Sequence, residues 1–204
     1  MTQNAAYPAG ASPSGAAADM AARLAACLPR LETPRLILRA ATTADFAVFR
    51  DFYAGPRAHF VGGPLTPELG WRMLAMEIGH WSLKGFGRFI VEEKTSGAAV
   101  GLVGPFEPYG WPEPELGWDL FDGHEGKGYA TEAARASRDY AYGTLGWQTA
   151  ISLVKPANIA SARVCERLGC VLESTFTHER HGQMQVWRHP APDALSDGGM
   201  EAYA

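Results

Sequence analysis

The stretch DGHEGKGYATEA (residues 122–133) carries the residue types best suited to chemistry, because three glycines and a lysine directly precede an expected helix. Glycine destabilises a helix or strand by roughly 0.5–1 kcal/mol relative to alanine, so Gly123, Gly126 and Gly128 indicate a backbone shape that side chains would block. A glycine-rich turn that enters a helix leaves N–H groups unpaired at the positive end of the helix dipole. Phosphate is the natural ligand of such a loop.

Two familiar phosphate-binding patterns do not fit this loop. The P-loop requires serine or threonine after its lysine, whereas Lys127 is followed by Gly128. The dinucleotide pattern GxGxxG is also absent, and the loop follows a β-meander instead of opening a β-α-β unit. The sequence therefore supports neither ATP nor NAD as the ligand.

The elements that must position the loop predict an α+β fold with a mixed sheet. We expect strands at residues 35–39, 88–93, 98–104, 115–121, 149–154, 170–177 and 184–189. We expect helices within residues 42–53, 67–83, 129–145 and 158–168. A strand that leads into the glycine loop and then into a helix is the arrangement that an anion site of this kind needs.

The ends of the chain differ in composition from its middle. Residues 1–30 begin with a stretch rich in Ala, Gly, Ser and Pro, which predicts a disordered or partly helical N-terminal tail. Residues 31–190 form the expected domain, and residues 191–204 are expected to be a flexible C-terminal tail.

Charge and composition exclude several functional classes. The 204 residues carry 18 lysines and arginines against 22 acids, a net charge of −4, which is the wrong sign for a nucleic-acid-binding protein. No secretory signal and no run of about 18 apolar residues is present, so we expect no membrane association. Three cysteines without a CxxC pattern favour a reducing, cytoplasmic location. The HERH segment (residues 178–181) lacks a third ligand, so no metal is expected.

The segment EGKGYATEA resembles the pyrophosphate loop of the GNAT superfamily of acyl-CoA-dependent N-acyltransferases, written Gln/Arg-x-x-Gly-x-Gly/Ala. The six positions of that pattern correspond here to Glu125, Gly126, Lys127, Gly128, Tyr129 and Ala130. The family prefers Gln or Arg where Glu125 stands, so the match has one departure.

Three further segments resemble the family in the same order along the chain. NIASARVCERLGC (158–170) is similar to the helix after the fifth strand, with Cys170 in place of a phenylalanine. LETPRLILRA (31–40) and PEPELGWDLF (112–121) resemble strands of the branch named for ribosomal-protein N-terminal acetyltransferases (RimJ/RimL-like). The resemblance covers about residues 31–190.

The resemblance implies a GNAT fold, with a mixed six- to seven-stranded sheet flanked by about four helices. It implies acetyl-CoA as cosubstrate, a small-molecule or peptide amine as acceptor, and leaves a homodimer open. The cofactor-binding residues that it implies are Leu120, Phe121, Glu125, Gly126, Lys127, Gly128, Tyr129, Ala130, Asn158 and Ser161.

Amine acetylation requires a neutral amine, and the resemblance implies that an acid on the strand before the loop takes the amine proton. Glu115 is the candidate base, and Asp119, four residues on and on the same strand face, is the alternative. The two carboxylates could instead form an electronegative pocket for a cationic substrate, and water could serve as the base. YGWPEP (109–114) directly precedes Glu115 and is expected to shape the acceptor mouth.

The proton returned to CoA comes from a tyrosine in many GNAT proteins, but the matching residue here is Cys165. Asn158, Ser161 and Cys165 fall within about a 60° arc of the expected helix. Serine is common in the RimJ/RimL-like branch where Ser161 stands, so Ser161 is the candidate donor. Its structural alternative is a place in the first turn of a helix capped by Asn158.

Two functions from different classes remain open on the sequence. The first is transfer of acetyl from acetyl-CoA to a primary amine by direct attack in a ternary complex, with a protein N-terminus or a small amine as acceptor. The second is a catalytically silent acyl-CoA-binding or regulatory module.

Four tryptophans are expected in the core or in the acceptor-pocket wall: Trp71, Trp81, Trp111 and Trp118.

Overall fold

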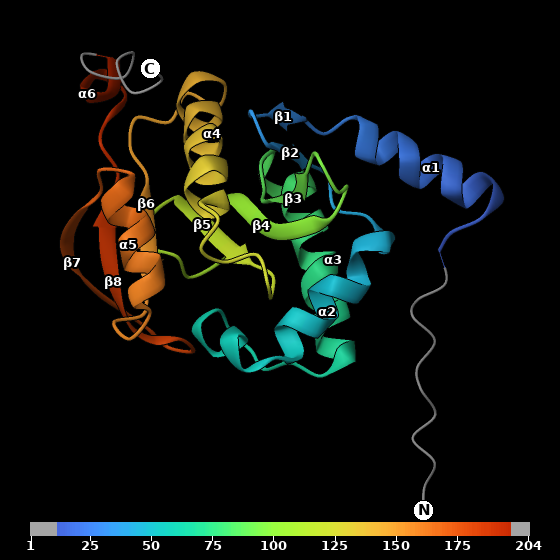
Figure 1. The fold of residues 1–204 in the computed structure, drawn as a ribbon, viewed down its shortest axis with the longest axis horizontal. Helices are drawn as coiled ribbons and strands as arrows, with labels where there is room; N and C mark the ends of the chain where they lie inside the picture. The colour runs from blue at the N-terminus through green and yellow to red at the C-terminus, as the bar shows by residue number, and fades with distance from the viewer. Residues whose placement is uncertain (1–11, 197–204) are drawn as a thin grey trace, which may run out of the picture.

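The computed structural model describes residues 12–196, which form an eight-stranded sheet with helices packed against it (Figure 1). The strands are β1 (Leu31–Glu32), β2 (Leu36–Arg39), β3 (Phe89–Glu93), β4 (Ala99–Phe106), β5 (Glu115–Leu120), β6 (Ile151–Val154), β7 (Val171–His178) and β8 (Gly182–Arg188). The helices are α1 (Gly15–Ala26), α2 (Phe46–Ala54), α3 (Pro67–Lys84), α4 (Tyr129–Gly143), α5 (Ile159–Arg167) and α6 (Pro192–Ser196), with 3₁₀ turns η1 (Thr43–Asp45) and η2 (Pro56–Phe60).

The sheet has the strand order β1-β2-β3-β4-β5-β6-β8-β7. Strands β1 to β5 form an antiparallel meander, and β6, β8 and β7 form a second antiparallel group. The two groups meet where β5 runs parallel to β6, and there a single pair, Glu115 with Ile151, is in register. The sheet therefore divides between β5 and β6, beside the glycine loop that follows β5.

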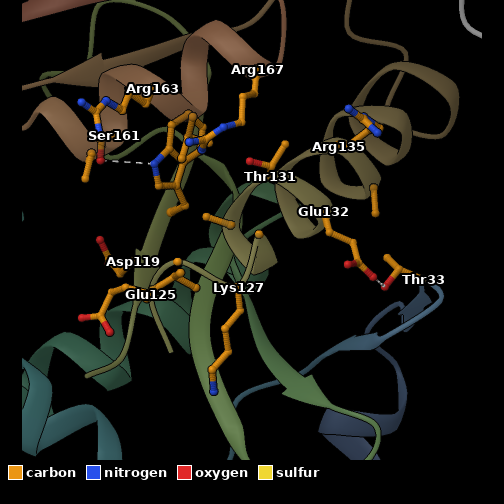
Figure 2. A pocket seen from close by; sticks show the side chains of 18 of the residues that line it. Thr33, Asp119, Glu125, Lys127, Thr131, Glu132, Arg135, Ser161, Arg163 and Arg167 are labelled. Carbon is orange, nitrogen blue, oxygen red and sulfur yellow. Dashed lines mark hydrogen bonds between the residues drawn. The ribbon is translucent and has the colours of Figure 1, made fainter. Parts of the chain in front are cut away.

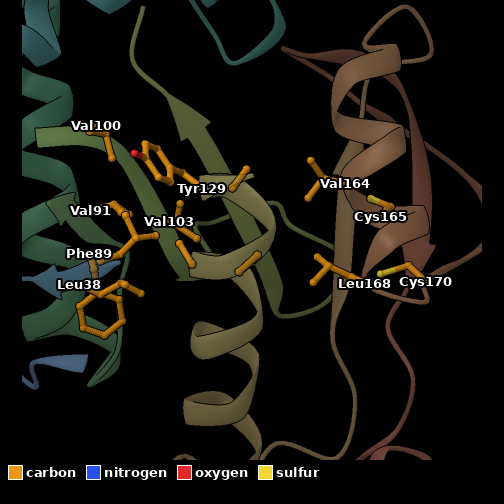
Figure 3. Close-up of a cluster of buried hydrophobic side chains, with 14 of the residues drawn as sticks. Leu38, Phe89, Val91, Val100, Val103, Tyr129, Val164, Cys165, Leu168 and Cys170 are labelled. Carbon is orange, nitrogen blue, oxygen red and sulfur yellow. The ribbon is translucent and has the colours of Figure 1, made fainter. Parts of the chain in front are cut away.

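The two faces of the sheet pack against different helices. On β3, Phe89 and Val91 join a cluster with Tyr129 of α4, which Figure 3 shows. Ile90 points the other way, into a cluster with Phe49 of α2. Successive residues of a strand face opposite sides, so one short apolar strand supplies both cores.

The α+β fold class and the mixed sheet expected from the sequence are confirmed, and every expected strand is present. The sheet has eight strands where six to seven were expected, because two residues before β2 fold back and pair with it as β1. Helix α1 lies within the expected N-terminal tail and α6 within the expected C-terminal tail, while residues 1–11 and 197–204 lie outside the described part. Between residues 12 and 196, no helix has the length and apolar character needed to cross a membrane.

Candidate active site

The glycine loop presents an open helix end. Gly128 is the residue that precedes α4, its φ is +82°, and no side chain caps the helix there. Gly126 has φ +75°, and a Cβ on it would meet no atom within 4 Å, so this glycine is needed for its backbone conformation. L-residues adopt such left-handed values at a cost of roughly 1–2 kcal/mol. The first N–H groups of α4 are thus free to bind an anion.

A cleft of about 1120 Å³ lies in front of this helix end, between α4, α5 and β5 (Figure 2). Its cationic lining residues are Arg35, Arg57, Lys127, Arg135, Arg163 and Arg167. An open helix N-terminus surrounded by cationic side chains suits a ligand with several phosphates.

Glu125, the residue that departs from the family pattern, is held by an arginine from a distant segment. Arg57 of η2 forms an ion pair with Glu125 and a second one with Asp122, at 2.7 Å. The same guanidinium donates to the carbonyl oxygen of Leu120 at 3.0 Å. The negative charge of Glu125 is therefore compensated by Arg57 of η2, which it shares with Asp122.

The far end of the cleft contains Ser161, on the first turn of α5. Asn158 caps this helix, because its Oδ1 accepts a hydrogen bond from the backbone N–H of Ser161 at 3.2 Å. The indole Nε1 of Trp118 donates to Ser161 Oγ at 3.3 Å, the dashed line in Figure 2. Ser161 Oγ is the acceptor of this bond, and the described part of the chain shows no hydrogen bond that the Ser161 hydroxyl donates.

Cys165 does not reach this cleft. Its side chain is fully buried in the core, next to Cys170 (Figure 3). A hydrogen bond with Cys170 and burial raise the pKa of Cys165, which keeps it a neutral thiol. Cys165 and Ser161 fall on the same arc of a helical projection, but they do not form one site. The second turn of α5, which carries Cys165, packs into the core.

A second, smaller cavity of about 380 Å³ adjoins the cleft and contains Glu115. The buried carboxylate of Glu115 accepts hydrogen bonds from Trp111 Nε1 and from the backbone N–H of Leu153, the latter at 3.0 Å. Burial raises the pKa of Glu115, and these two hydrogen bonds oppose the rise by stabilising the charged form.

Asp119 occupies the same face of β5 but is already paired. Its Oδ2 accepts hydrogen bonds from Tyr53 at 2.7 Å and from Arg88 at 2.9 Å. Arg88 also forms an ion pair with Glu77 on α3. The buried guanidinium of Arg88 therefore offsets part of the negative charge in the electronegative pocket considered from the sequence. Of the two candidate carboxylates on β5, Glu115 is the one without a cationic partner in the described structure.

The cleft and the smaller cavity share a boundary. Six residues line both spaces: Phe60, Val61, Trp118, Asp119, Asn158 and Ser161. A ligand in the cleft and a second ligand in the smaller cavity would thus meet beside Trp118 and Ser161.

Residues 35–171 match the family model described as "Acetyltransferase (GNAT) domain". The chain belongs to the GNAT acetyltransferase family. A crystal structure of an acetyltransferase from Agrobacterium tumefaciens is 39% identical, with a TM-score of 0.74 over 80% of this chain and 95% of that one. The Bacillus subtilis protein YkkB is 37% identical over 97 residues, which are 46% of this chain and 56% of that protein, so the alignment spans little more than half of this relative.

Two more distant acetyltransferase structures share the fold. The RimL ribosomal L7/L12 alpha-N-protein acetyltransferase is 14% identical, with a TM-score of 0.65 over 79% of this chain and 93% of that one. The Vibrio cholerae spermidine N-acetyltransferase, in complex with CoA and spermine, is 20% identical, with a TM-score of 0.66 over 80% and 99% of the two chains.

Family membership implies acetyl transfer from acetyl-CoA to an amine. The cleft of this GNAT protein fits a pyrophosphate-containing cosubstrate, since it combines an uncapped helix end, left-handed glycines and cationic walls. Most cofactor-binding residues expected from the sequence line the cleft: Leu120, Glu125, Gly126, Lys127, Gly128, Ala130, Asn158 and Ser161. The structure offers no group of three or more potential metal ligands among residues 12–196.

Two residues expected from the sequence to bind the cofactor, Phe121 and Tyr129, pack their side chains into the core. Phe121 is fully buried in the α2 cluster, and Tyr129 is buried on the other face, where its hydroxyl donates to Glu93. Neither side chain lines the cleft. They flank the glycine loop, so each fixes one end of the loop by packing into a core.

The tryptophans follow the sequence expectation in three of four cases. Trp81 is in the core, and Trp111 and Trp118 line the smaller cavity. The expectation for Trp71 is wrong: this residue lies on the outer surface of α3, 40% exposed, with its ring edge against Phe46.

The sequence did not indicate Arg57 or Arg88 as site residues, because each acts through a partner that is distant in the chain.

Proposed function

We propose that this protein transfers an acetyl group from acetyl-CoA directly to a primary amine, with both substrates bound at once. The observation that carries the proposal is the shared boundary of the two cavities at Trp118 and Ser161, with Glu115 in the smaller one. Acetyl-CoA would occupy the cleft and supply an activated thioester. The amine would occupy the smaller cavity and attack across the boundary.

Glu115 would accept the proton of the amine. A lysine-type amine with a pKa near 10.4 requires roughly 4–5 kcal/mol to deprotonate at pH 7, whereas an α-amine with a pKa near 7.7–8.0 requires about 1. Burial gives Glu115 a raised pKa, which makes its charged form a stronger base than an exposed glutamate. Trp111 and Leu153 hold the carboxylate in place through both of its oxygens.

Ser161 would donate a proton to the departing CoA thiolate. Trp118 donates to Ser161 Oγ, which leaves the hydroxyl hydrogen available and orients it away from the indole. The cap from Asn158 fixes the backbone of the same turn. The structural and the catalytic readings of Ser161 are therefore compatible.

One observation favours the alternative of a silent acyl-CoA-binding module. The residue at the position where many GNAT proteins carry the donor tyrosine is Cys165, and it is buried in the core. Under that alternative the protein would bind acetyl-CoA in the cleft and transfer nothing.

The proposal is tested by a panel of acceptors, assayed by release of free CoA from acetyl-CoA. The panel would contain short peptides with free N-termini, amino acids and polyamines, because relatives with this fold are named for a ribosomal-protein N-terminus and for spermidine. Acceptor-dependent CoA release with a mass increase of the acceptor supports the transferase. Calorimetric binding of acetyl-CoA without transfer to any acceptor would support the silent module instead.

A further inference from the structure

The smaller cavity has opposite charges at its two ends. At its buried end, Glu115 and Asp119 are the lining carboxylates, and Glu77 lies behind them. Among residues 12–196, the cation at this end is Arg88, which pairs with both Asp119 and Glu77. Glu115 has no cationic partner, so carboxylates outnumber cations at this end, which suits an ammonium or amine group.

The outer end of the cavity is lined by cations. Lys155 and Arg180 line it, and within residues 12–196 neither forms an ion pair with a carboxylate. The Lys155 ammonium donates only to the carbonyl oxygen of His59, at 2.7 Å. His178 and His181 lie beside them, with ring centroids 4.8 Å apart. Burial and the neighbouring His178, Arg180 and Lys155 lower the pKa of His181, so positive charge is crowded at this end.

Strand β6 and the residue after it link the two ends of the cavity. Glu115 accepts from the backbone N–H of Leu153, and Lys155 follows two residues later, directly after β6. The backbones of Leu153 and Lys155 are about 7 Å apart at a rise of about 3.3 Å per residue, and the Lys155 side chain extends from there to the carbonyl oxygen of His59.

The wall between the two ends is apolar. Trp111 spans it, because its Nε1 donates to Glu115 while its ring lies 5.1 Å from His178 and 5.5 Å from His181. The other apolar lining side chains include Met73, Met76, Phe106, Tyr109 and Met184. Aromatic and thioether groups of this kind pack against apolar or aromatic side chains of a ligand.

We propose that the acceptor is zwitterionic: a primary amine and a carboxylate at opposite ends of an apolar or aromatic body. The amine would lie at Glu115 and the carboxylate at Lys155 and Arg180. A polycation such as spermidine would place a second positive charge against these side chains. This inference rests on the proposed function, since it assigns the smaller cavity to the acceptor.

The test compares alanyl-phenylalanine with its C-terminal amide, because the two share the amine and the aromatic body and differ in the carboxylate. We expect kcat/KM for the dipeptide to exceed that for the amide by about tenfold or more, mainly through KM, and spermidine to be the poorest of the three. In a Lys155→Met/Arg180→Met variant, we expect the ratio to approach one because the dipeptide loses activity, while the amide changes less than about threefold.

The matched control is Arg72→Met, which removes an exposed cation of α3 that lies outside the cavity lining and pairs with Glu68. It should leave the ratio unchanged. Equal kcat/KM values for dipeptide and amide, or a preference for spermidine, would overturn the inference while acetyl transfer to amines still stood. If no acceptor is acetylated, calorimetry with CoA present decides: tighter binding of the dipeptide, lost in the double variant, supports the zwitterion site, and equal binding overturns it.

Discussion

The Oε1 atom of Glu115 accepts a hydrogen bond from the backbone N–H of Leu153, with 3.0 Å between oxygen and nitrogen. This contact joins β5 to β6 just past the one residue pair that the two strands share in register. The carboxylate is thus positioned by the division of the sheet itself. Its other oxygen accepts from Trp111, so both oxygens are fixed in the wall of the smaller cavity.

Replacing Glu115 with glutamine should lower kcat by roughly 10²-fold or more and leave acetyl-CoA affinity nearly unchanged, because general bases contribute about 10²–10⁴-fold. Raising the pH should recover part of the rate, since more of the amine is then neutral. Steady-state kinetics from pH 6 to 9 and calorimetry with acetyl-CoA measure the two quantities. Glu113→Gln is the matched control, because Glu113 pairs with Arg188 outside both cavities. Wild-type rates in the Glu115 variant would move the role to Asp119 or to water.

Trp111→Phe should shift the acidic limb of the pH–rate profile to higher pH. Burial raises the pKa of Glu115, and the Trp111 hydrogen bond opposes that rise, so its loss should raise the pKa further. The base is active when charged, and activity is lost as the pH falls through this pKa. With the same acceptor in both proteins the amine contributes equally, so the difference reports Glu115. Trp71→Phe, on the exposed face of α3, should not move the limb.

Ser161→Ala should lower kcat by about 10²-fold if this hydroxyl supplies the proton to the thiolate. Trp118→Phe removes the hydrogen bond to Ser161 Oγ, and one such bond contributes about 1 kcal/mol, which corresponds to roughly fivefold in kcat. In the Ser161→Ala background, Trp118→Phe should have no further effect on kcat. Additive losses in the double variant would show that the indole acts on the reaction independently of Ser161.

Glu125→Gln should change acetyl-CoA affinity by less than about threefold, with little dependence on salt, because Arg57 already compensates the carboxylate. Arg57→Met should weaken affinity by about tenfold, since it removes a cation from the cleft lining and leaves Glu125 and Asp122 without their partner, and the loss should shrink at high ionic strength. Adding Glu125→Gln to Arg57→Met should restore part of the affinity. A tenfold tightening in Glu125→Gln alone would show that this carboxylate faces the cosubstrate.

Gly128→Val should abolish the rise in melting temperature that acetyl-CoA produces. The residue has φ +82°, and a Cβ there would lie 3.4 Å from the Arg35 guanidinium, at the entry to α4. In the wild type, a hundredfold excess of ligand over its dissociation constant stabilises the native state by about 2.7 kcal/mol. Gly143→Val, at the other end of the same helix and in open space, should keep the shift. A full shift in the Gly128 variant would place the cosubstrate elsewhere.

The parts of the site that could be predicted from the sequence are local in the chain. The glycine loop and the Asn158 cap on Ser161 lie within a few residues, so spacing alone indicates them. The pairing of Glu125 with Arg57 and that of Asp119 with Arg88 could not be predicted, because each depends on tertiary packing of distant segments. The same physical limit explains why a helical projection placed Cys165 with Ser161: periodicity gives the face of a helix but not where that face meets the core.

Four buried side chains limit local unfolding around the smaller cavity: Tyr53, Glu77, Arg88 and Asp119. These side chains come from α2, α3, the residue before β3, and β5, and they are joined by buried hydrogen bonds and ion pairs at the inner end of the smaller cavity. Separating one partner from a buried ion pair costs about 3–5 kcal/mol, so α3 cannot leave the sheet without separating Glu77 from Arg88, and α2 cannot leave it without breaking the hydrogen bond from Tyr53 to Asp119. We therefore expect amide hydrogen exchange in α2 and α3 to be as slow as in β5, which would make the acceptor side a rigid wall and not a mobile lid.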